Sequence, residues 1–203
     1  MTVIKTKKNV GIFIFDNVEI LDFSGPYEVF SSVRLSTKSR ADIYNIPAPF
    51  YTFTISEKRK EVTTSGGLKI NSNYNFNNYP KLDILIIPGG IGTRKLLCNK
   101  IVLDWISSNK SVPIIASVCT GVLLLAKNGM LHKKKATTHW GAFDTLKNID
   151  QTITIIKNKR FVLDKYYSSS GVSAGIDMSL HIIEKIYNKN IAKNTAKYME
   201  YKY

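Results

Sequence analysis

Cysteine, histidine and long apolar segments are scarce in this chain of 203 residues. Only Cys98 and Cys119 are present, which excludes a disulfide framework and makes a cytoplasmic setting the default expectation. No apolar segment approaches the length of a membrane span, and the opening residues MTVIKTKKNV lack the apolar core of a secretion signal. We therefore expect a cytoplasmic protein without a membrane segment.

Metal and nucleotide motifs are also absent from the sequence. The three histidines do not pair with carboxylates at the spacing of metal ligands, so we predict no metal site. The Gly89-Gly90 pair is compatible with a phosphate-binding loop, but neither G-x-x-x-x-G-K-[ST] nor G-x-G-x-x-G occurs. We expect no cofactor, and we interpret Trp105 and Trp140 as packing residues rather than a stacking platform.

Acidic residues are few as well. The 15 Asp and Glu residues stand against 29 Lys and Arg residues, which gives a formal net charge of +14. Such a balance is typical of proteins that contact nucleic acid or acidic membranes. Here the lysines are spread over the termini and the polar segments, among many asparagines and isoleucines. We interpret the charge as a compositional bias and expect no specific nucleic-acid partner and no membrane partner.

Residues 112–130, VPIIASVCTGVLLLAKNGM, organise the chain. Residues 112–118 are apolar and β-branched, which is typical of a buried strand, and an apolar helix follows from Thr120 until Gly129 ends it. Cys119 stands between strand and helix, with the small residues Ser117 and Gly121 two positions to either side. This pattern predicts a nucleophile elbow.

The predicted position of Cys119 at a helix N-terminus favours its thiolate form. Unpaired backbone N–H groups and the positive end of the helix dipole would face the sulfur there. We therefore expect a thiol pKa below the free value of about 8.5. The alternative is a buried structural thiol. Cys98 lies in a predicted helix-turn region and is interpreted as incidental.

Strands and helices alternate along the rest of the sequence, which predicts a doubly wound α/β sheet, mostly parallel. No linker or repeat divides the chain, so we predict one domain over residues 1–203, with residues 1–9 as a loose extension. Ser24 is expected to cap the first long helix, with Pro26 in its first turn, which leaves Asp22 between the first strand and that helix. That position is the carboxyl edge of the sheet, where ligands bind. The predicted strands are 10–15, 43–46, 51–55, 82–87, 112–118, 152–156 and 161–163; a hairpin or edge addition is expected within 62–75, and helices are expected from about residues 24, 93, 120, 143, 173 and 190.

Five short motifs follow one another along the chain: Leu21-Asp22-Phe23-Ser24-Gly25-Pro26, Pro88-Gly89-Gly90, Ser117-Val118-Cys119-Thr120-Gly121, Ala136-Thr137-Thr138-His139-Trp140 and Ala174-Gly175-Ile176-Asp177. Together they resemble the ThiJ/PfpI superfamily of flavodoxin-like proteins, and within it the isonitrile hydratase branch. The resemblance runs from about Val10 to the C-terminus. It implies a flavodoxin-like fold.

The resemblance also implies roles for individual residues. Cys119 would be the nucleophile, and Asp22 matches the acidic residue beside it. The backbone N–H groups of Gly90 and Thr120 match oxyanion-hole positions, and Gly89 and Gly90 let the backbone approach a substrate closely. His139 is the histidine expected nearest the site, and a core histidine satisfied by the backbone is an equal alternative. Members of the superfamily are commonly homodimers, so we expect a homodimer that acts on a small molecule.

Thr120 marks a departure within the superfamily. The peptidase-like and glyoxalase-like branches usually carry histidine immediately after the cysteine. Without that base, a thiol–imidazole pair for acyl transfer is not available locally. Asp22 offers another proton donor, because burial and a neighbouring thiolate both raise a carboxyl pKa. The alternative role for Asp22 is a helix cap.

These residues lead to one main hypothesis and three alternatives. The main hypothesis is a cysteine-dependent hydro-lyase that adds water to an isonitrile and gives an N-substituted formamide. The first alternative is a glyoxalase- or deglycase-like enzyme acting on a reactive aldehyde. The second is a ligand-sensing domain like those of AraC-type regulators, without their helix-turn-helix region. The third is a redox sensor, since an exposed thiol of low pKa oxidises readily.

Overall fold

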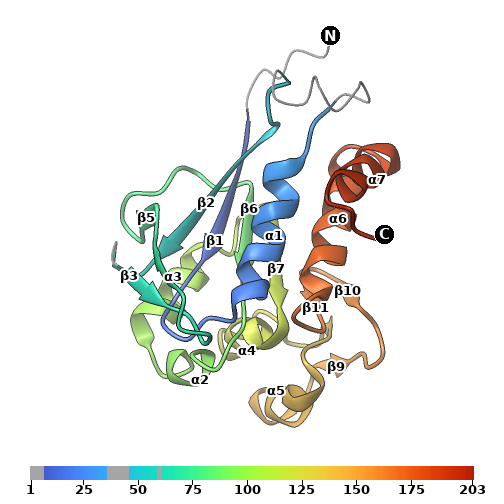
Figure 1. Ribbon diagram of the computed structural model, residues 1–203. Coiled ribbons are helices and arrows are strands. Elements are labelled where there is room, and N and C mark those ends of the chain that lie inside the picture. The colour runs from blue at the N-terminus through green and yellow to red at the C-terminus, as the bar shows by residue number, and fades with distance from the viewer. Residues whose placement is uncertain (1–6, 36–45, 59–60) are drawn as a thin grey trace.

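The computed structural model describes residues 7–35, 46–58 and 61–203, and a sheet of seven strands forms its centre (Figure 1). The strand order is β10-β11-β7-β6-β1-β2-β5, and every neighbouring pair is parallel except β10 with β11. The predicted α/β sheet, mostly parallel, is confirmed. The strands span Lys8–Phe13 (β1), Phe50–Ser56 (β2), Tyr74–Asn75 (β5), Ile84–Ile87 (β6), Ile114–Val118 (β7), Phe161–Leu163 (β10) and Tyr167–Ser169 (β11).

Helices cover both faces of this sheet, as a doubly wound fold requires. On one face, α1 and α6 pack side by side and α7 packs on α6, and Phe30 of α1 contacts Phe50 of β2 with ring centroids 5.2 Å apart (Figure 1). On the other face, Trp105 of α3 packs against Phe13 of β1 at 5.3 Å, which confirms Trp105 as a packing residue. No helix in the described part of the chain has both the length and the apolarity needed to cross a bilayer. The helices span Ile20–Ser32 (α1), Thr93–Leu96 (α2), Lys100–Ser108 (α3), Val122–Lys127 (α4), Phe143–Ile149 (α5), Ala174–Ile186 (α6) and Lys189–Tyr198 (α7).

The central strands β6 and β7 explain why the site forms where it does. All four residues of β6 are buried, because helices on both faces exclude water from the middle of the sheet. Strands β1, β6 and β7 run parallel, so their carboxyl ends meet at one edge. The chain that follows them carries Asp22, Gly89 and Cys119, respectively.

The first helix begins earlier than the sequence predicts. α1 starts at Ile20 and not near Ser24, and no side chain caps it. The backbone N–H of Glu19 donates to the carbonyl of Gly89 at 3.0 Å, a tertiary bond that fixes the helix start. Pro26 therefore lies inside the helix, and Asp22 lies in its first turn instead of before it.

Other predicted boundaries change because of local hydrogen bonds. Segment 62–75 forms the expected hairpin, β3 (Glu61–Thr63) with β4 (Lys69–Asn71), followed by the edge strand β5. Strand 152–156 reduces to β9 (Thr154–Ile155), paired with β8 (Lys135–Ala136) outside the large sheet, because Thr152 is held in a turn by Asp150. Residues 43–45 of the predicted strand 43–46 lie outside the described residues, and Ile46 lies in a bend. Residues 8 and 9, assigned to a loose extension, pair with β2 and belong to β1.

Gly121 is the position where a side chain should disturb this fold most directly. It ends the 3-10 turn η2 (Cys119–Gly121), and a β-carbon there would lie 2.1 Å from the Ile87 carbonyl oxygen. Backbone atoms cannot move aside as a flexible side chain can. We therefore predict that Gly121→Ala lowers the free energy of unfolding by about 1–3 kcal/mol, measured by urea denaturation.

Gly141→Ala is the matched control. Its β-carbon would meet only the His139 side chain, at 3.4 Å, and the position is exposed. It should change the free energy of unfolding by no more than about 0.5 kcal/mol. Equal losses in the two variants would contradict the account of the turn.

Candidate active site

Cys119 directly follows β7 and opens the turn that leads into α4. Its φ is +55°, a conformation that residues other than glycine rarely adopt and that persists only where the surroundings enforce it. Close packing of Gly121 against the Ile87 carbonyl supplies that enforcement. α4 ends at Lys127, and Gly129 follows with φ +68°, as predicted. The side chain of Cys119 is 7% exposed.

Asp22 reaches the same edge of the sheet from the first turn of α1. Its side chain is fully buried, and its Oδ2 accepts a hydrogen bond from the backbone N–H of Gly89 at 3.0 Å. Its Oδ1 is buried without an N–H or O–H partner. A buried carboxyl oxygen without such a donor is costly when charged. Asp22 does not act as a cap for the helix, because it lies inside the first turn of α1 and no side chain caps that helix.

Burial controls the protonation of this pair. Burial of the carboxyl is the main cause that raises the pKa of Asp22 to about 7. The hydrogen bond from Gly89 lowers this pKa, and the charge of Glu19 raises it further. Burial and then the negative charge of Asp22 raise the pKa of Cys119 to about 12, although the N–H groups of Thr120 and Val172 act in the opposite direction. The predicted low thiol pKa is therefore wrong. Between these two values the carboxyl and the thiol together hold one proton.

The predicted oxyanion-hole donors differ in what they contact. The N–H of Thr120 interacts with the Cys119 sulfur. The N–H of Gly90 donates instead to Thr120 Oγ1 at 3.0 Å, and the hydroxyl of Thr93 donates to the Gly90 carbonyl at 2.8 Å. Gly89 lies between Asp22 and Thr120, because a β-carbon there would be 2.6 Å from Thr120 N and 2.8 Å from Asp22 Oδ2. The oxyanion role of Gly90 stays a prediction.

His139 lies beside the cysteine with Gly171 between them. A β-carbon on Gly171 would be 3.3 Å from both Cys119 Sγ and His139 Cδ2. His139 Nδ1 accepts a hydrogen bond from the Gly141 N–H at 3.2 Å, so this histidine is both near the site and satisfied by the backbone. Trp140 is 78% exposed, and its interpretation as a packing residue is wrong because η3 (Trp140–Ala142) turns its side chain to the surface.

A cavity of about 410 Å³ adjoins this cysteine. Gly171 and Val172 belong to its lining; the N–H of Val172 interacts with the sulfur of Cys119, and a β-carbon on Gly171 would be 3.3 Å from that sulfur. Sequence reasoning missed Val172 and the 158–160 turn, because no periodic pattern or motif marks either segment. The lining comprises Thr137, Thr138, His139, Trp140, Phe143, Asn158, Lys159, Arg160, Ser170, Gly171 and Val172.

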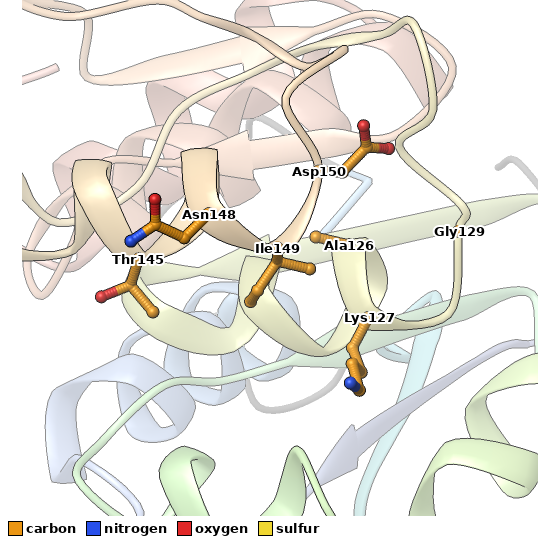
Figure 2. Close-up of a pocket in the computed structure, with 7 residues that line it drawn as sticks. All are labelled: Ala126, Lys127, Gly129, Thr145, Asn148, Ile149 and Asp150. Carbon is orange, nitrogen blue, oxygen red and sulfur yellow. The ribbon is translucent and has the colours of Figure 1, made fainter.

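A second cavity, of about 560 Å³, lies between the end of α4 and α5 (Figure 2). Ala126 and Lys127 of α4 and Thr145, Asn148 and Ile149 of α5 are among the residues that line it. It contains none of the predicted site residues, so the cavity beside Cys119 is the better candidate site. Within the described ranges, no three His, Cys, Asp or Glu side chains are grouped as a metal ion would require.

Known proteins share both the sequence and the fold. The profile of the DJ-1/PfpI family matches residues 8–185. Isonitrile hydratase of Pseudomonas putida is 30% identical over 194 residues, which cover 95% of this chain and 78% of the hydratase. The HTH-type transcriptional regulator GbdR of Pseudomonas aeruginosa is 23% identical over 93% of this chain, which spans only 49% of the regulator. A crystal structure of a ThiJ/PfpI family protein from Pseudomonas syringae has a TM-score of 0.83 at 24% identity, covering 98% of this chain and 76% of that one. The predicted flavodoxin-like architecture is confirmed.

The raised pKa of Asp22 predicts a pH-dependent stability difference. A carboxyl whose pKa rises on folding binds its proton more tightly in the folded state, so stability is lost as pH rises toward the folded pKa. Asp22→Asn removes that loss. The quantity of interest is the free energy of unfolding of this variant minus that of the parent. We predict that this difference is about 2 kcal/mol larger at pH 8 than at pH 5, measured by urea denaturation.

Asp104→Asn, on the exposed surface of α3, is the control and should show no such pH-dependent difference. An Asp22→Asn advantage that is equal at both pH values would mean that the carboxyl titrates normally.

Proposed function

Because the chain belongs to the DJ-1/PfpI family, we propose that it is a cysteine-dependent hydro-lyase that adds water to an isonitrile and releases an N-substituted formamide. One observation carries the proposal. A fully buried carboxyl, Asp22, and a buried thiol, Cys119, meet at the carboxyl edge of the sheet and hold one proton between them above about pH 7. The 30% identity with isonitrile hydratase of Pseudomonas putida gives it further support.

The first step needs a nucleophile and a proton at the same carbon. The sulfur of Cys119 attacks the terminal carbon of R–N≡C and forms a carbon–sulfur bond. The proton held by the pair passes through Asp22 to that carbon, which gives a thioimidate, R–N=CH–S–Cys. The atoms balance, because the thiol has added across the isonitrile carbon. The N–H groups of Thr120 and Val172 stabilise the sulfur while it carries negative charge.

The second step returns the enzyme to its starting state. Asp22, now ionised, accepts a proton from water as the water oxygen attacks the thioimidate carbon, and it passes that proton to the imidate nitrogen. Collapse of the tetrahedral adduct breaks the carbon–sulfur bond and releases R–NH–CHO. The sulfur and the carboxylate together retain one proton, so the sum is one isonitrile and one water consumed for each formamide.

A ligand-sensing domain is the second candidate, and one observation favours it. The chain matches about half the length of a transcriptional regulator, GbdR, at 23% identity. The aldehyde alternative has Thr120 against it, since that position lacks the histidine of the glyoxalase-like branch. Formation of lactate from methylglyoxal, dependent on Cys119, would favour the aldehyde chemistry over hydration.

The cellular location, oligomeric state and partners of the proposed enzyme are inferred from the sequence alone. We expect a cytoplasmic homodimer acting on a small molecule, without a specific nucleic-acid partner. Sedimentation at several protein concentrations measures the oligomeric state.

Replacing Cys119 tests the proposed chemistry. Cys119→Ala should reduce formamide production from a small isonitrile to the uncatalysed rate, because no carbon–sulfur bond can form. Asp22→Asn should reduce kcat by about 10²- to 10⁴-fold, the usual range for loss of a proton-transfer group. Chromatographic measurement of the formamide gives both rates.

Cys98→Ser is the matched control, because Cys98 is exposed in the turn between α2 and α3 and should leave the rate unchanged. Full activity of Cys119→Ala on an isonitrile would exclude covalent catalysis.

A further inference from the structure

The cavity beside Cys119 has a cationic rim. Lys159 and Arg160 line it, and no Asp or Glu is among its lining residues. Lys157, from the same turn between β9 and β10, places its Nζ 5.4 Å from the ring centroid of Phe143, which also lines the cavity. Three cations from one turn therefore lie at or beside the cavity, and they form what we call its rim.

Arg160 is partly neutralised, whereas the two lysines are not. Its Nε donates to Asp177 Oδ2 at 2.8 Å, and its Nη2 donates to Ser173 Oγ at 3.1 Å. Tyr201 donates to the same carboxylate at 3.1 Å. These contacts hold Arg160 in place and offset its charge. The remaining positive field at the entrance therefore comes from Lys157 and Lys159, both exposed.

Another part of the cavity wall is aromatic. Trp140 is 78% exposed beside His139, with ring centroids 5.2 Å apart, and Phe143 is half-buried. A large apolar side chain left exposed next to a cavity is a usual feature of a binding surface.

The floor of the cavity leads to the reactive sulfur. Gly171 has φ +134°, and any side chain there would come within 3.3 Å of Cys119 Sγ. A glycine at this point leaves the cavity and the sulfur in close proximity. A small reactive carbon bound beside Gly171 and Val172 would thus lie close to the thiol.

We propose that this cavity selects substrates in which the reactive carbon is joined, through an apolar body, to a carboxylate. The carboxylate lies against Lys159 with Lys157 beside it, and the apolar body contacts Trp140 and Phe143. That the reactive group of the substrate is an isonitrile rests on the proposed function. The preference for an anionic substrate depends only on the lysines of the rim, Lys157 and Lys159.

A pair of alkylating reagents measures that preference without any enzyme turnover. Iodoacetate and iodoacetamide both form a carbon–sulfur bond with a thiolate and release iodide, and they differ in one negative charge. The ratio of their rate constants at one thiol does not depend on how much thiolate is present. Cys98, which is exposed, supplies a reference thiol in the same sample, and peptide mass spectrometry separates the two sites.

Charge reversal at the rim should change the ratio at Cys119 alone. We expect Lys159→Glu to lower the iodoacetate-to-iodoacetamide ratio at Cys119 about fivefold at low salt, the effect of a two-unit charge change roughly 9 Å from an anion in water. The parent ratio should fall as salt is added. Lys110→Glu makes the same change in net charge at the opposite end of the sheet, before β7, and should leave the ratio at Cys119 within about 1.5-fold of the parent.

Two results would overturn the inference. One is an equal ratio at Cys119 in Lys159→Glu and Lys110→Glu. The other is the absence of Cys119 alkylation by either reagent, because the cavity would then give no access to the sulfur.

A substrate pair separates this inference from the proposed function. Isocyanoacetate and its methyl ester carry the same isonitrile group and differ in charge. The parent should hydrate isocyanoacetate with the higher kcat/KM, and Lys159→Glu should reverse or abolish that order. Equal kcat/KM values in the parent would overturn the anion preference and leave hydration standing. If neither compound is hydrated, the proposed function fails, and the alkylation ratio alone decides the inference.

Discussion

A carboxyl group buried without a compensating charge is the constraint on which the site depends. Asp22 has one hydrogen-bond donor, the Gly89 N–H, and its other oxygen has no N–H or O–H partner. A charged carboxylate in that position is strongly disfavoured, so the pair releases its first proton only as the pH approaches 7 and keeps the second until about pH 12. That retained proton is the one the proposed hydration delivers to the isonitrile carbon. The same burial raises the pKa of Cys119, which makes the two groups a single proton-holding unit rather than an independent acid and nucleophile.

Glycines in the segments that follow β6 and β7 allow Asp22 and Cys119 to lie close together. Gly89 lies against Asp22 and Thr120 at distances that no β-carbon tolerates, and Gly121 does the same against the end of β6. Gly171 lies between the cavity and the sulfur of Cys119, and it has no side chain that would cover the sulfur. Other parts of the cavity wall, in contrast, come from the turn after β9 and from η3. In this account, the tightly packed edge of the sheet supplies the reacting groups. The cationic and aromatic rim supplies the proposed preference for an anionic substrate.

The sequence predicts those parts unequally. Apolar periodicity locates β6 and β7, and parallel topology then brings the residues after them to one edge, so Cys119, Asp22 and Gly89 are found together as expected. The start of α1 is not predictable from its own residues, because a bond from Glu19 to the distant Gly89 sets it. The direction of the thiol pKa shift is missed for the same reason, since burial by α1 and the 170–172 segment is a property of the folded chain. Val172 and Lys159 lie in turns without periodicity, and only the fold assigns them to the site.

The central claim is that Cys119 carries the substrate covalently, and rapid quenching followed by mass spectrometry of the intact protein and of its peptides tests it most directly. The thiol adds across the isonitrile, so the account predicts a mass gain of one whole isonitrile on the Cys119 peptide and none in Cys119→Ser. In Asp22→Asn the adduct should persist longer, because the group that activates water is missing. Formamide production at the full parental rate, with Cys119 unmodified at every time point, would contradict the account.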